Sequence, residues 1–278
     1  TTRGLGAGGN PDIGAQSARE QIHELKAAIQ GADMVFVCAG LGGGTGSGVA
    51  PVAAQVAQEQ GAIVIGVVTM PFSIEKARID KAEFALKQLR EVSNTVIVID
   101  NNRLSSIAGN LPIRQAFAVA NELISTMIKS IVEIISVPSL INLDYADVRA
   151  IMSSGGVSVT GIGEADGDKR VDEATKRALS NPLLDVSYDG STGAMIHITG
   201  GPDMTLDEAE RVGEIITAGL DADANVIWGA RIDDEMRGNL RIMTIITGVK
   251  SPYVLGKGRA RPSPQALEMN HELGLETI

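Results

Sequence analysis

The sequence predicts an α/β fold in which a doubly wound parallel sheet is followed by a smaller α+β domain. Three observations lead to this prediction. In the first half of the chain, short apolar runs alternate with longer segments of helical spacing. These runs are apolar on both faces, as strands are when helices cover both sides of a parallel sheet. After Gly155, two helical segments accompany about four strand-like runs.

Composition and charge narrow the function classes. At 278 residues, the chain is long enough for one large domain or two of ordinary size. Hydrophobic residues make up 44% and aromatics only 3%, so the core must consist mainly of Val, Ile, Leu and Ala. The formal net charge of −10 argues against nucleic acid as a general partner, because its phosphates would be repelled.

Cysteine usage and hydropathy indicate a compartment. One Cys and three scattered His exclude a disulfide framework and a Cys/His metal cluster. Cys38 lies inside an apolar run, and we expect a buried thiol in a reducing, cytoplasmic location. No apolar run is long enough to span a bilayer and the first residues do not form a signal peptide, so we expect no direct membrane insertion.

The first half of the chain begins with a helix. Asn10 suits an N-cap and Pro11 a first helical position, and the helix is expected to run to about Gln30. Strands and helices then alternate. We expect strands at 34–39, 63–69 and 95–99, and helices at 45–59 and 75–91.

A long helix is expected from Pro112 to Ser136, and its few charges predict burial on most sides. A shorter helix should follow at about 145–153. The later strands are expected at 157–163, 194–199, 225–230 and 240–247, with helices at 168–180 and 205–220. From Lys250 the chain is rich in Gly, Pro and Arg, and we expect poor packing there.

The segment Gly40–Gly48 joins the first strand to the next helix, and six of its nine residues are glycine. Such a loop directs backbone N–H groups and the positive helix end at one point, which predicts a phosphate site. The alternative is a mobile surface loop, but flexible linkers are rarely clamped between a buried strand and a helix. Without a lysine or a Walker A motif, backbone amides, the helix dipole, Thr45 and a metal ion would have to balance the charge.

Two more strand ends carry polar or small residues, and they should lie beside this loop in a parallel sheet. Thr69-Met70-Pro71-Phe72 follows the second strand, and Asp100-Asn101-Asn102-Arg103 follows the third. Together these loops predict a ligand-binding crevice. A G-x-G-x-x-G match at Gly4–Gly9 suggests an NAD-dependent dehydrogenase as an alternative. However, no strand precedes it, and Glu24 lies inside a predicted helix.

Several motifs, spread along nearly the whole chain, resemble those of the FtsZ proteins of the tubulin/FtsZ superfamily. Their sequences are most similar to archaeal members, with the second archaeal paralogue as a candidate. They are GLGAGGNP at 4–11, GGGTGSG at 42–48, MPFSIE at 70–75, NNRL at 101–104, AFAVANELI at 116–124 and NLDYADV at 142–148. The resemblance implies a Rossmann-like GTP-binding domain at 1–111, a central core helix at 112–138, an α+β GTPase-activating domain at 139–250 and a tail at 251–278. It also implies GTP and GDP as ligands, with Mg²⁺ as the ion.

The resemblance further implies which residues bind the nucleotide. The phosphate-binding loop is matched by Gly42, Gly43, Gly44, Thr45, Gly46 and Ser47, and the loop over the terminal phosphate by Gly6, Ala7, Gly8 and Gly9. The ribose, phosphate and base contacts are matched by Thr69, Pro71, Glu75, Arg78, Asn101, Phe117 and Asn121.

The base-reading role of the last two residues fits their chemistry. The side-chain amide of Asn121 can pair with both donor and acceptor atoms of guanine, and the Phe117 ring can cover a base face. For Phe117, packing within the protein is an equal alternative. An Asn inside an apolar helix needs a hydrogen-bond partner, and we expect a ligand to be that partner.

The segment 142–147 matches the family's N-x-D-x-x-D loop. From the residues alone, Asp144 is a helix N-cap and Asp147 an acid favoured in a first helical turn. The resemblance implies instead that the loop enters the nucleotide site of the next subunit, where Asp144, Asp147 and Asn142 act on the attacking water. Such a head-to-tail contact builds a filament. The resemblance thus implies an assembly-dependent GTPase that polymerises for cell division.

The resemblance also implies a cytoplasmic homopolymer at the mid-cell division ring, with a membrane-tethering adaptor as a partner. Two departures from the family pattern stand out. Family members usually begin with a strand and another Gly-rich loop, which precede the part matched here, and they carry one more residue between the positions of Glu75 and Arg78. A non-hydrolysing structural or regulatory relative is the alternative function.

Overall fold

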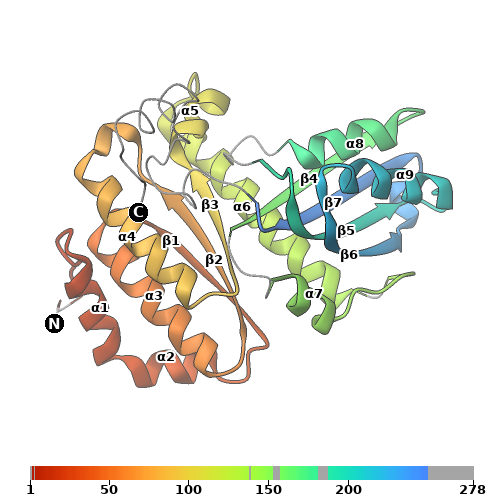
Figure 1. The fold of residues 1–278 in the computed structure, drawn as a ribbon. Helices are drawn as coiled ribbons and strands as arrows, with labels where there is room; N and C mark the ends of the chain where they lie inside the picture. Colours follow the sequence, from red (N-terminus) through yellow and green to blue (C-terminus); the bar gives the residue numbers. More distant parts are fainter. Residues whose placement is uncertain (1, 3, 138, 153–156, 181–186, 250–278) are drawn as a thin grey trace, which may run out of the picture.

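The structure is a computed structural model that describes residues 2, 4–137, 139–152, 157–180 and 187–249. Two sheets, each with its own covering helices, lie on either side of the long helix α6 (Figure 1). The predicted tail at 251–278 lies outside the described residues.

The N-terminal half is built on three parallel strands in the order β1-β2-β3. Its elements are α1 (Pro11–Glu20), α2 (Ile22–Ile29), β1 (Met34–Gly40), α3 (Gly44–Glu59), β2 (Ile63–Met70), η1 (Ser73–Glu75), α4 (Ala77–Glu91), β3 (Thr95–Asp100) and α5 (Asn101–Ala108). Gly40 pairs with Thr69, and Met70 pairs with Asp100, so the carboxyl ends of the strands lie level at one edge. The predicted parallel sheet is confirmed.

β1 lies at the edge of this sheet, and its position overturns the prediction for Cys38. Among the described residues, β1 pairs with β2 alone. Its side chains alternate between two faces, so Val37 is buried while the neighbouring Cys38 is exposed. The apolar run does form a strand, but the described part of the chain leaves the side chain of Cys38 uncovered on its face.

The helix expected from Asn10 to Gln30 is two helices. Asn10 is the N-cap, and its Oδ1 accepts from the Asp12 N–H at 2.9 Å. The helical hydrogen bonding then stops at Gln21, whose φ of −107° and ψ of 24° are not helical. α2 begins immediately afterwards, at Ile22. The N-cap therefore predicted where the helix begins, but no feature of the sequence predicted the break at Gln21.

Two further predictions in this half are wrong in detail. The helix expected from Glu75 is interrupted at Lys76, which has a φ of 32° and is the one described non-glycine residue with positive φ. The 3₁₀ turn η1 therefore precedes α4. The polar residues after β3 form the helix α5 instead of a loop, because Asp100 Oδ1 accepts from the Asn102 N–H at 2.8 Å and caps that helix.

α6 (Ile113–Ser136) is the predicted long helix, but it is not buried on most sides. Its buried residues form one stripe at helical spacing, namely Ala120, Met127, Ile131 and Ile134. The first turns of the helix are open, so that Ile113 and Phe117, which continue the same stripe, are 76% and 43% exposed. A helix with few charges can also carry an exposed apolar surface, and here that surface lies in the first turns.

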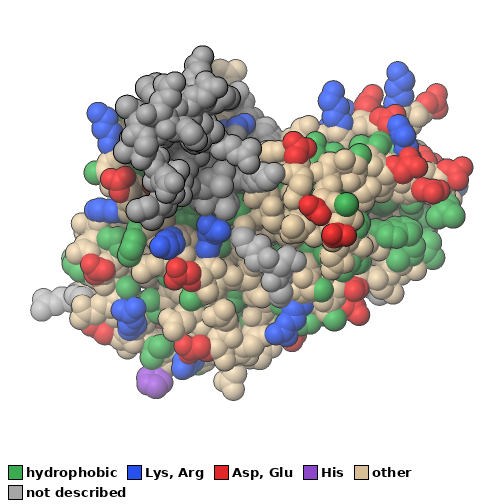
Figure 2. All heavy atoms as spheres, viewed as in Figure 1, with side chains coloured by type: hydrophobic (Ala, Val, Ile, Leu, Met, Phe, Trp, Pro, Cys, Tyr) green, Lys and Arg blue, Asp and Glu red, His purple; other side chains and the backbone are tan. Residues whose placement is uncertain are grey.

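The C-terminal half contains α7 (Tyr145–Met152), β4 (Ser158–Asp166), α8 (Arg170–Leu179), β5 (Ser191–Gly200), α9 (Leu206–Thr217), β6 (Leu220–Ile232), η2 (Asp234–Met236) and β7 (Asn239–Thr247). Its sheet has the order β4-β7-β5-β6, with β5 and β6 parallel and the other pairs antiparallel. α8 and α9 cover one face and enclose a small core. Acidic side chains gather over these two helices on the face shown in Figure 2.

The two halves share one hydrophobic core. Val96 of β3 forms a parallel bridge with Val157, just before β4. Beside this bridge, the hydroxyls of Thr95 and Ser158 lie 2.5 Å apart and are buried. A contiguous cluster of buried side chains runs from β2 and β3 through α6 to β5 and β7. The halves are therefore packed as one body around α6.

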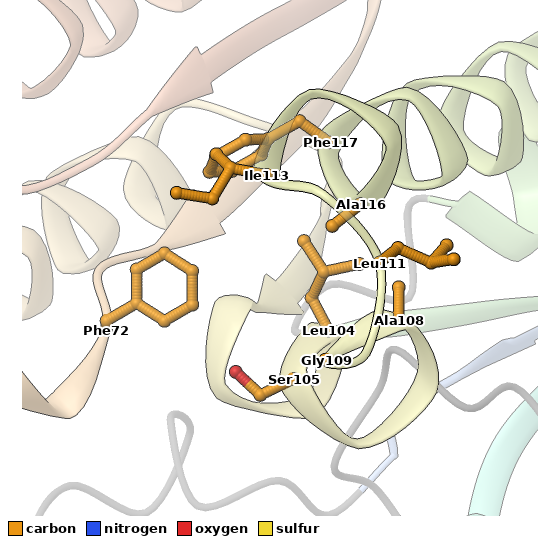
Figure 3. A pocket seen from close by; sticks show the side chains of 9 residues that line it. All are labelled: Phe72, Leu104, Ser105, Ala108, Gly109, Leu111, Ile113, Ala116 and Phe117. Carbon is orange, nitrogen blue, oxygen red and sulfur yellow. The ribbon is translucent and has the colours of Figure 1, made fainter.

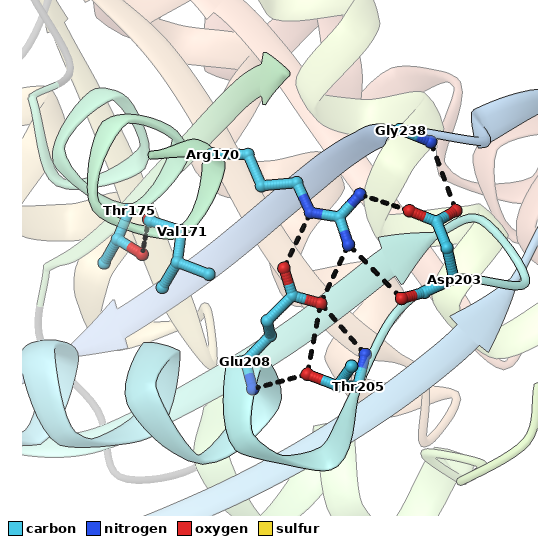
Figure 4. Close-up of polar contacts among 7 residues, drawn as sticks. All are labelled: Arg170, Val171, Thr175, Asp203, Thr205, Glu208 and Gly238. Atoms are coloured by element: carbon cyan, nitrogen blue, oxygen red, sulfur yellow. Dashed lines mark hydrogen bonds and ion pairs between the residues drawn. The ribbon is translucent and has the colours of Figure 1, made fainter. Parts of the chain in front are cut away.

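A buried arginine holds the far end of the C-terminal half together (Figure 4). The Arg170 guanidinium lies 2.7 Å from Glu208 Oε1 and 2.7 Å from Asp203 Oδ2. Asp203 Oδ1 accepts in turn from the Gly238 N–H at 3.1 Å. The hydrogen bonds from Arg170 lower the pKa of both carboxyl groups. This cluster ties the start of α8 to the start of α9 and to the turn before β7.

Candidate functional site

The glycine loop between β1 and α3 has a defined shape. Gly42 has a φ of 97°, which residues other than glycine rarely adopt. Its N–H donates to Ser47 Oγ at 2.8 Å. Ser47 is buried. Its hydroxyl oxygen therefore acts on the loop itself, by holding the turn at Gly42 in place.

Close packing explains most of the glycines in this loop. A Cβ on Gly44 would lie 2.6 Å from Asn10 N, and a Cβ on Gly46 would lie 2.1 Å from Gly40 O. Neither position can accept a side chain without moving the backbone. Gly43 differs, because nothing lies within 4 Å of the place its Cβ would take. Gly43, the N-cap residue of α3, faces open space, so a ligand can approach its backbone closely.

The N-terminus of α3 is open to an anion. Its first N–H groups have no partner within the helix, no side chain caps this end, and no acid lies in the first turn. Thr45, in that turn, is exposed. Its Oγ1 accepts from the Ala7 N–H at 3.3 Å, which brings the second predicted phosphate loop, Gly6–Gly9, against the first.

Two cationic residues of α4 lie beside these loops, and only Arg78 was expected there from the sequence. Lys81 Nζ donates to Gly9 O at 2.6 Å. Arg78, one turn earlier on the same helix, has its Cβ 3.0 Å from the position of a Cβ on Gly42. Lys81 thus brings a positive charge from α4 to these loops, whereas the Arg78 guanidinium is paired with Glu75.

The three strand-end loops do meet. Pro71, after β2, has its Cγ 3.3 Å from the position of a Cβ on Gly42. The third loop is joined to the second because Asn102 Oδ1 accepts from the Ser73 N–H at 2.9 Å. Asn101, the residue implied by the family, is the first residue of α5 and lies next to this link.

Glu75 and Arg78 pair with each other in this structure. Arg78 Nη1 lies 2.6 Å from Glu75 Oε2, and Glu75 Oε1 accepts from the Phe72 N–H at 3.0 Å. The ion pair spans Lys76, the residue with positive φ. Thr69 lies at the end of β2, paired with Gly40.

An aromatic pair marks the side of the site nearest α6. The rings of Phe72 and Phe117 meet edge to face, with centroids 6.4 Å apart. They line a cavity of about 160 Å³ between η1, α5 and the start of α6 (Figure 3). Asn121 lies one turn beyond Phe117 and is exposed. The expectation that Asn121 is interior and needs a partner is therefore wrong, because this face of α6 is open to solvent.

Asp144 and Asp147 form a reciprocal cap at the start of α7. The Asp147 N–H donates to Asp144 Oδ1 at 2.8 Å, and the Asp144 N–H donates to Asp147 Oδ2 at 3.1 Å. Asn142 is engaged locally as well, since its Oδ1 accepts from the Ser139 N–H at 2.6 Å. The helix cap expected from the residues alone is present. It leaves one oxygen of each carboxylate without a hydrogen bond to any described residue.

The acids and the glycine loop lie at opposite ends of β1. Tyr145, between the two acids, donates its hydroxyl hydrogen to Asp33 O at 2.5 Å, just before the strand begins. The glycine loop begins where the strand ends, at Gly40. Seven residues of strand place these two points roughly 20 Å apart. An aspartate side chain cannot bridge that distance, so the acids do not reach the glycine loop of their own chain.

Comparisons with known proteins decide the family. Residues 1–109 match the model for the tubulin/FtsZ family GTPase domain, and residues 156–250 match the model for the FtsZ family C-terminal domain. Cell division protein FtsZ 2 of Methanocaldococcus jannaschii is 58% identical over 259 residues, which make up 92% of this chain and 68% of that protein. The chain belongs to the FtsZ family.

Further FtsZ proteins agree with this assignment. Cell division protein FtsZ 1 of Archaeoglobus fulgidus is 52% identical over 257 residues, covering 92% of this chain and 70% of that protein. An empty FtsZ dimer from M. jannaschii superposes with a TM-score of 0.79 at 48% identity, over 89% of this chain and 72% of that one. The chain thus spans about two thirds of the length of the curated relatives it matches. The predicted family, fold and GTPase class are confirmed.

Membership of the FtsZ family removes the dehydrogenase alternative, and the structure agrees because Glu24 lies within α2. In the described ranges, no group of three His, Cys, Asp or Glu side chains could hold a metal ion. None of the helices in those ranges, α6 included, is both long and apolar enough to cross a bilayer.

Proposed function

We propose that this FtsZ-family GTPase binds GTP at the carboxyl ends of β1, β2 and β3 and hydrolyses it between subunits of a cell-division filament. Asp144 and Asp147 of one subunit complete the site of the next. The observation that carries this proposal is the position of the two half-sites at opposite ends of β1. A head-to-tail contact brings one subunit's acids to its neighbour's nucleotide, and repetition of that contact builds a filament.

The nucleotide's phosphates would lie against the glycine loop. The N–H groups at the start of α3, with Gly43 in front of them, suit an anion. Arg78 and Lys81 add positive charge from α4, and Lys81 can exchange Gly9 O for the terminal phosphate. Mg²⁺ fits as an ion held mainly by phosphate oxygens and water, since the exposed Thr45 hydroxyl offers one neutral ligand and no acid lies nearby in that turn.

The base and ribose would lie between η1, α5 and α6. The exposed Phe117 ring, supported edge-on by Phe72, offers a flat surface to a base. Asn121 follows one turn later on the same exposed face and can pair with guanine. Asn101 and Glu75 lie on the connecting elements, where the ribose would pass.

Hydrolysis would depend mainly on placement of the attacking water. Asp144 Oδ2 and Asp147 Oδ1 accept no hydrogen bond from described residues, so each can accept one from a water molecule of the neighbouring site. Two such bonds would orient the water's oxygen toward the terminal phosphate, and phosphoryl transfer requires little more from the protein than orientation and charge stabilisation.

The location at the mid-cell division ring in the cytoplasm, and a membrane-tethering adaptor as a partner, belong to the same proposal. They are supported by the cell-division proteins among the relatives. Nucleic acid is not a proposed partner, because the net charge of −10 opposes it.

One observation favours a second candidate, a relative that assembles without turnover. The reciprocal cap already gives both aspartates a structural task at the start of α7. In that case the acids stabilise a helix and the filament forms without hydrolysis.

The GTPase rate per subunit, measured against protein concentration, separates the two candidates. We expect the rate to rise with concentration and to fall about 100-fold in Asp147→Ala. Asp147→Asn keeps a capping oxygen and should fall equally, which separates catalysis from capping. Asp172→Ala, at an exposed acid of α8, is the matched control. A rate independent of concentration, or full turnover in Asp147→Ala, refutes hydrolysis in trans.

A further inference from the structure

Tyr145 lies between the two acids and connects them to the sheet of their own subunit. Its hydroxyl donates to Asp33 O at 2.5 Å. The same carbonyl accepts from the Ile63 N–H at 2.8 Å, at the point where β1 and β2 begin to pair. The hydroxyl thus binds the backbone where the pairing of β1 with β2 begins, and the glycine loop follows at the other end of β1.

The rest of α7 is attached elsewhere. Val148, Ile151 and Met152 are fully buried, and the helix packs on β5 and β6 of the C-terminal half. Tyr145 is therefore the point at which an acid-bearing helix of the C-terminal half makes a direct hydrogen bond to the N-terminal half.

The chain before Tyr145 is anchored to the C-terminal half as well. Ile141 forms a bridge with Ala230 of β6. Leu143 is buried beside Gly229, where a Cβ would lie 2.9 Å from Leu143 Cγ. These anchors leave the acids outside and fix the segment to β6 and to the core that the two halves share. The Tyr145 hydroxyl adds a direct hydrogen bond from this segment to the start of β1.

We propose that Tyr145 is a positioning residue for hydrolysis in the neighbouring subunit, which rests on the proposed function above. A filament places a neighbour's nucleotide relative to the sheet that carries β1, so a small displacement of the start of α7 relative to β1 would move the acids away from that nucleotide. The Tyr145–Asp33 hydrogen bond holds Asp144 and Asp147 in the frame of β1. It thereby sets the acids at the neighbour's phosphate.

Tyr145→Phe isolates this function. The variant loses one hydroxyl, keeps the ring that packs against the core, and leaves Asp33 O satisfied by Ile63 N–H. No buried polar group is left without a partner, so the fold should be retained. The matched control is Tyr188→Phe, because the Tyr188 hydroxyl makes no hydrogen bond to a described residue.

The test measures kcat and KM for GTP at saturating protein, and assembly with a non-hydrolysable GTP analogue. We expect Tyr145→Phe to lower kcat about tenfold, because misplacement of a catalytic group by a fraction of an ångström is costly. KM, nucleotide affinity and assembly should match those of Tyr188→Phe. A purely structural defect would change these quantities together.

Mixed filaments add a readout specific to positioning in trans. Gly43→Ala subunits should bind GTP poorly but carry intact acids. Their addition to Tyr145→Phe subunits should raise the rate per nucleotide-competent subunit, because a wild-type acid end then faces an intact nucleotide site.

The outcomes separate this inference from the function on which it rests. Wild-type kcat in Tyr145→Phe, or a loss that mixing does not restore, overturns the positioning role while Asp147→Ala still loses turnover. Full turnover in Asp147→Ala overturns the proposed function itself.

Discussion

Two substitutions in the glycine loop should affect different properties of the protein, although both replace a glycine of the same motif by alanine. A Cβ on Gly46 would lie 2.1 Å from Gly40 O, a backbone atom of β1 that cannot rotate away. A Cβ on Gly43 meets nothing within 4 Å, and its φ of −90° and ψ of 176° suit any residue. Gly46→Ala should therefore damage the fold, whereas Gly43→Ala should damage ligand binding.

The magnitudes follow from these contacts. Overpacking costs about 1–3 kcal/mol, and alanine recovers roughly 1 kcal/mol of helix propensity relative to glycine. Because the clash is with backbone, we expect Gly46→Ala to lose about 2 kcal/mol of unfolding free energy, or roughly 4–8 °C in Tm for a chain of this size. Gly43→Ala should stay within about 0.5 kcal/mol of wild type.

Thermal melts without nucleotide, paired with GTP titrations, check both halves of the prediction. Gly43→Ala should bind GTP at least about tenfold more weakly, a loss of roughly 1.4 kcal/mol, because its methyl group occupies the space a phosphate would approach. Wild-type affinity in Gly43→Ala would remove the argument that this glycine faces a ligand. An unchanged Tm in Gly46→Ala would show that the loop can yield, and that its glycines are not explained by packing.

Two further predictions concern the C-terminal half. Arg170→Met leaves two carboxylates without their cation and should lower the free energy of unfolding by about 2 kcal/mol. This is less than for a fully buried pair, because both carboxylates keep some water contact. The control Arg211→Met removes an exposed arginine and should change the free energy of urea unfolding by less than about 0.5 kcal/mol. Burial, together with Arg231, lowers the pKa of His197 to about 4. The unfolded chain therefore binds an extra proton between about pH 6.5 and 4. As the pH decreases through that window, the free energy of unfolding should fall by at most about 3 kcal/mol. His197→Leu should flatten this part of the curve, and an equal slope in both proteins would contradict the assignment.

Much of the fold can be predicted from the sequence, because helices and strands depend on the local pattern of apolar and polar residues. β2 and β3 are apolar on both faces and are buried on both faces. The helix expected from position 205 is α9, and Thr205 and Glu208 form a reciprocal cap at its start. The position of the glycine loop at the carboxyl end of a strand follows from the parallel alternation.

Exposure was harder to predict, because it depends on what packs against a residue. Cys38 sits in the same apolar run as Val37, yet only one face of an edge strand is covered in the described part of the chain. Asn121 sits in a helix poor in charges, yet on its open side. Neither outcome changes the local pattern, so no local pattern could have revealed it.

The site contacts that the sequence did not predict are those made by tertiary packing. Lys81 reaches Gly9, 72 positions earlier in the chain. Phe72 meets Phe117 across the cavity between η1 and α6. The only available signal for Lys81 was its spacing of three from Arg78, which puts both on one face of α4.

Under the proposed hydrolysis in trans, the arrangement of the two half-sites restricts which assemblies can hydrolyse GTP. A dimer with two-fold symmetry brings like surfaces together, so nucleotide end would meet nucleotide end, or acid end would meet acid end. Neither contact completes a site, because the acids lie roughly 20 Å from the glycine loop of their own chain. Only head-to-tail addition does so, and a filament then holds one complete site fewer than it has subunits. Short filaments should therefore show a lower rate per subunit than long ones, even when every subunit holds GTP.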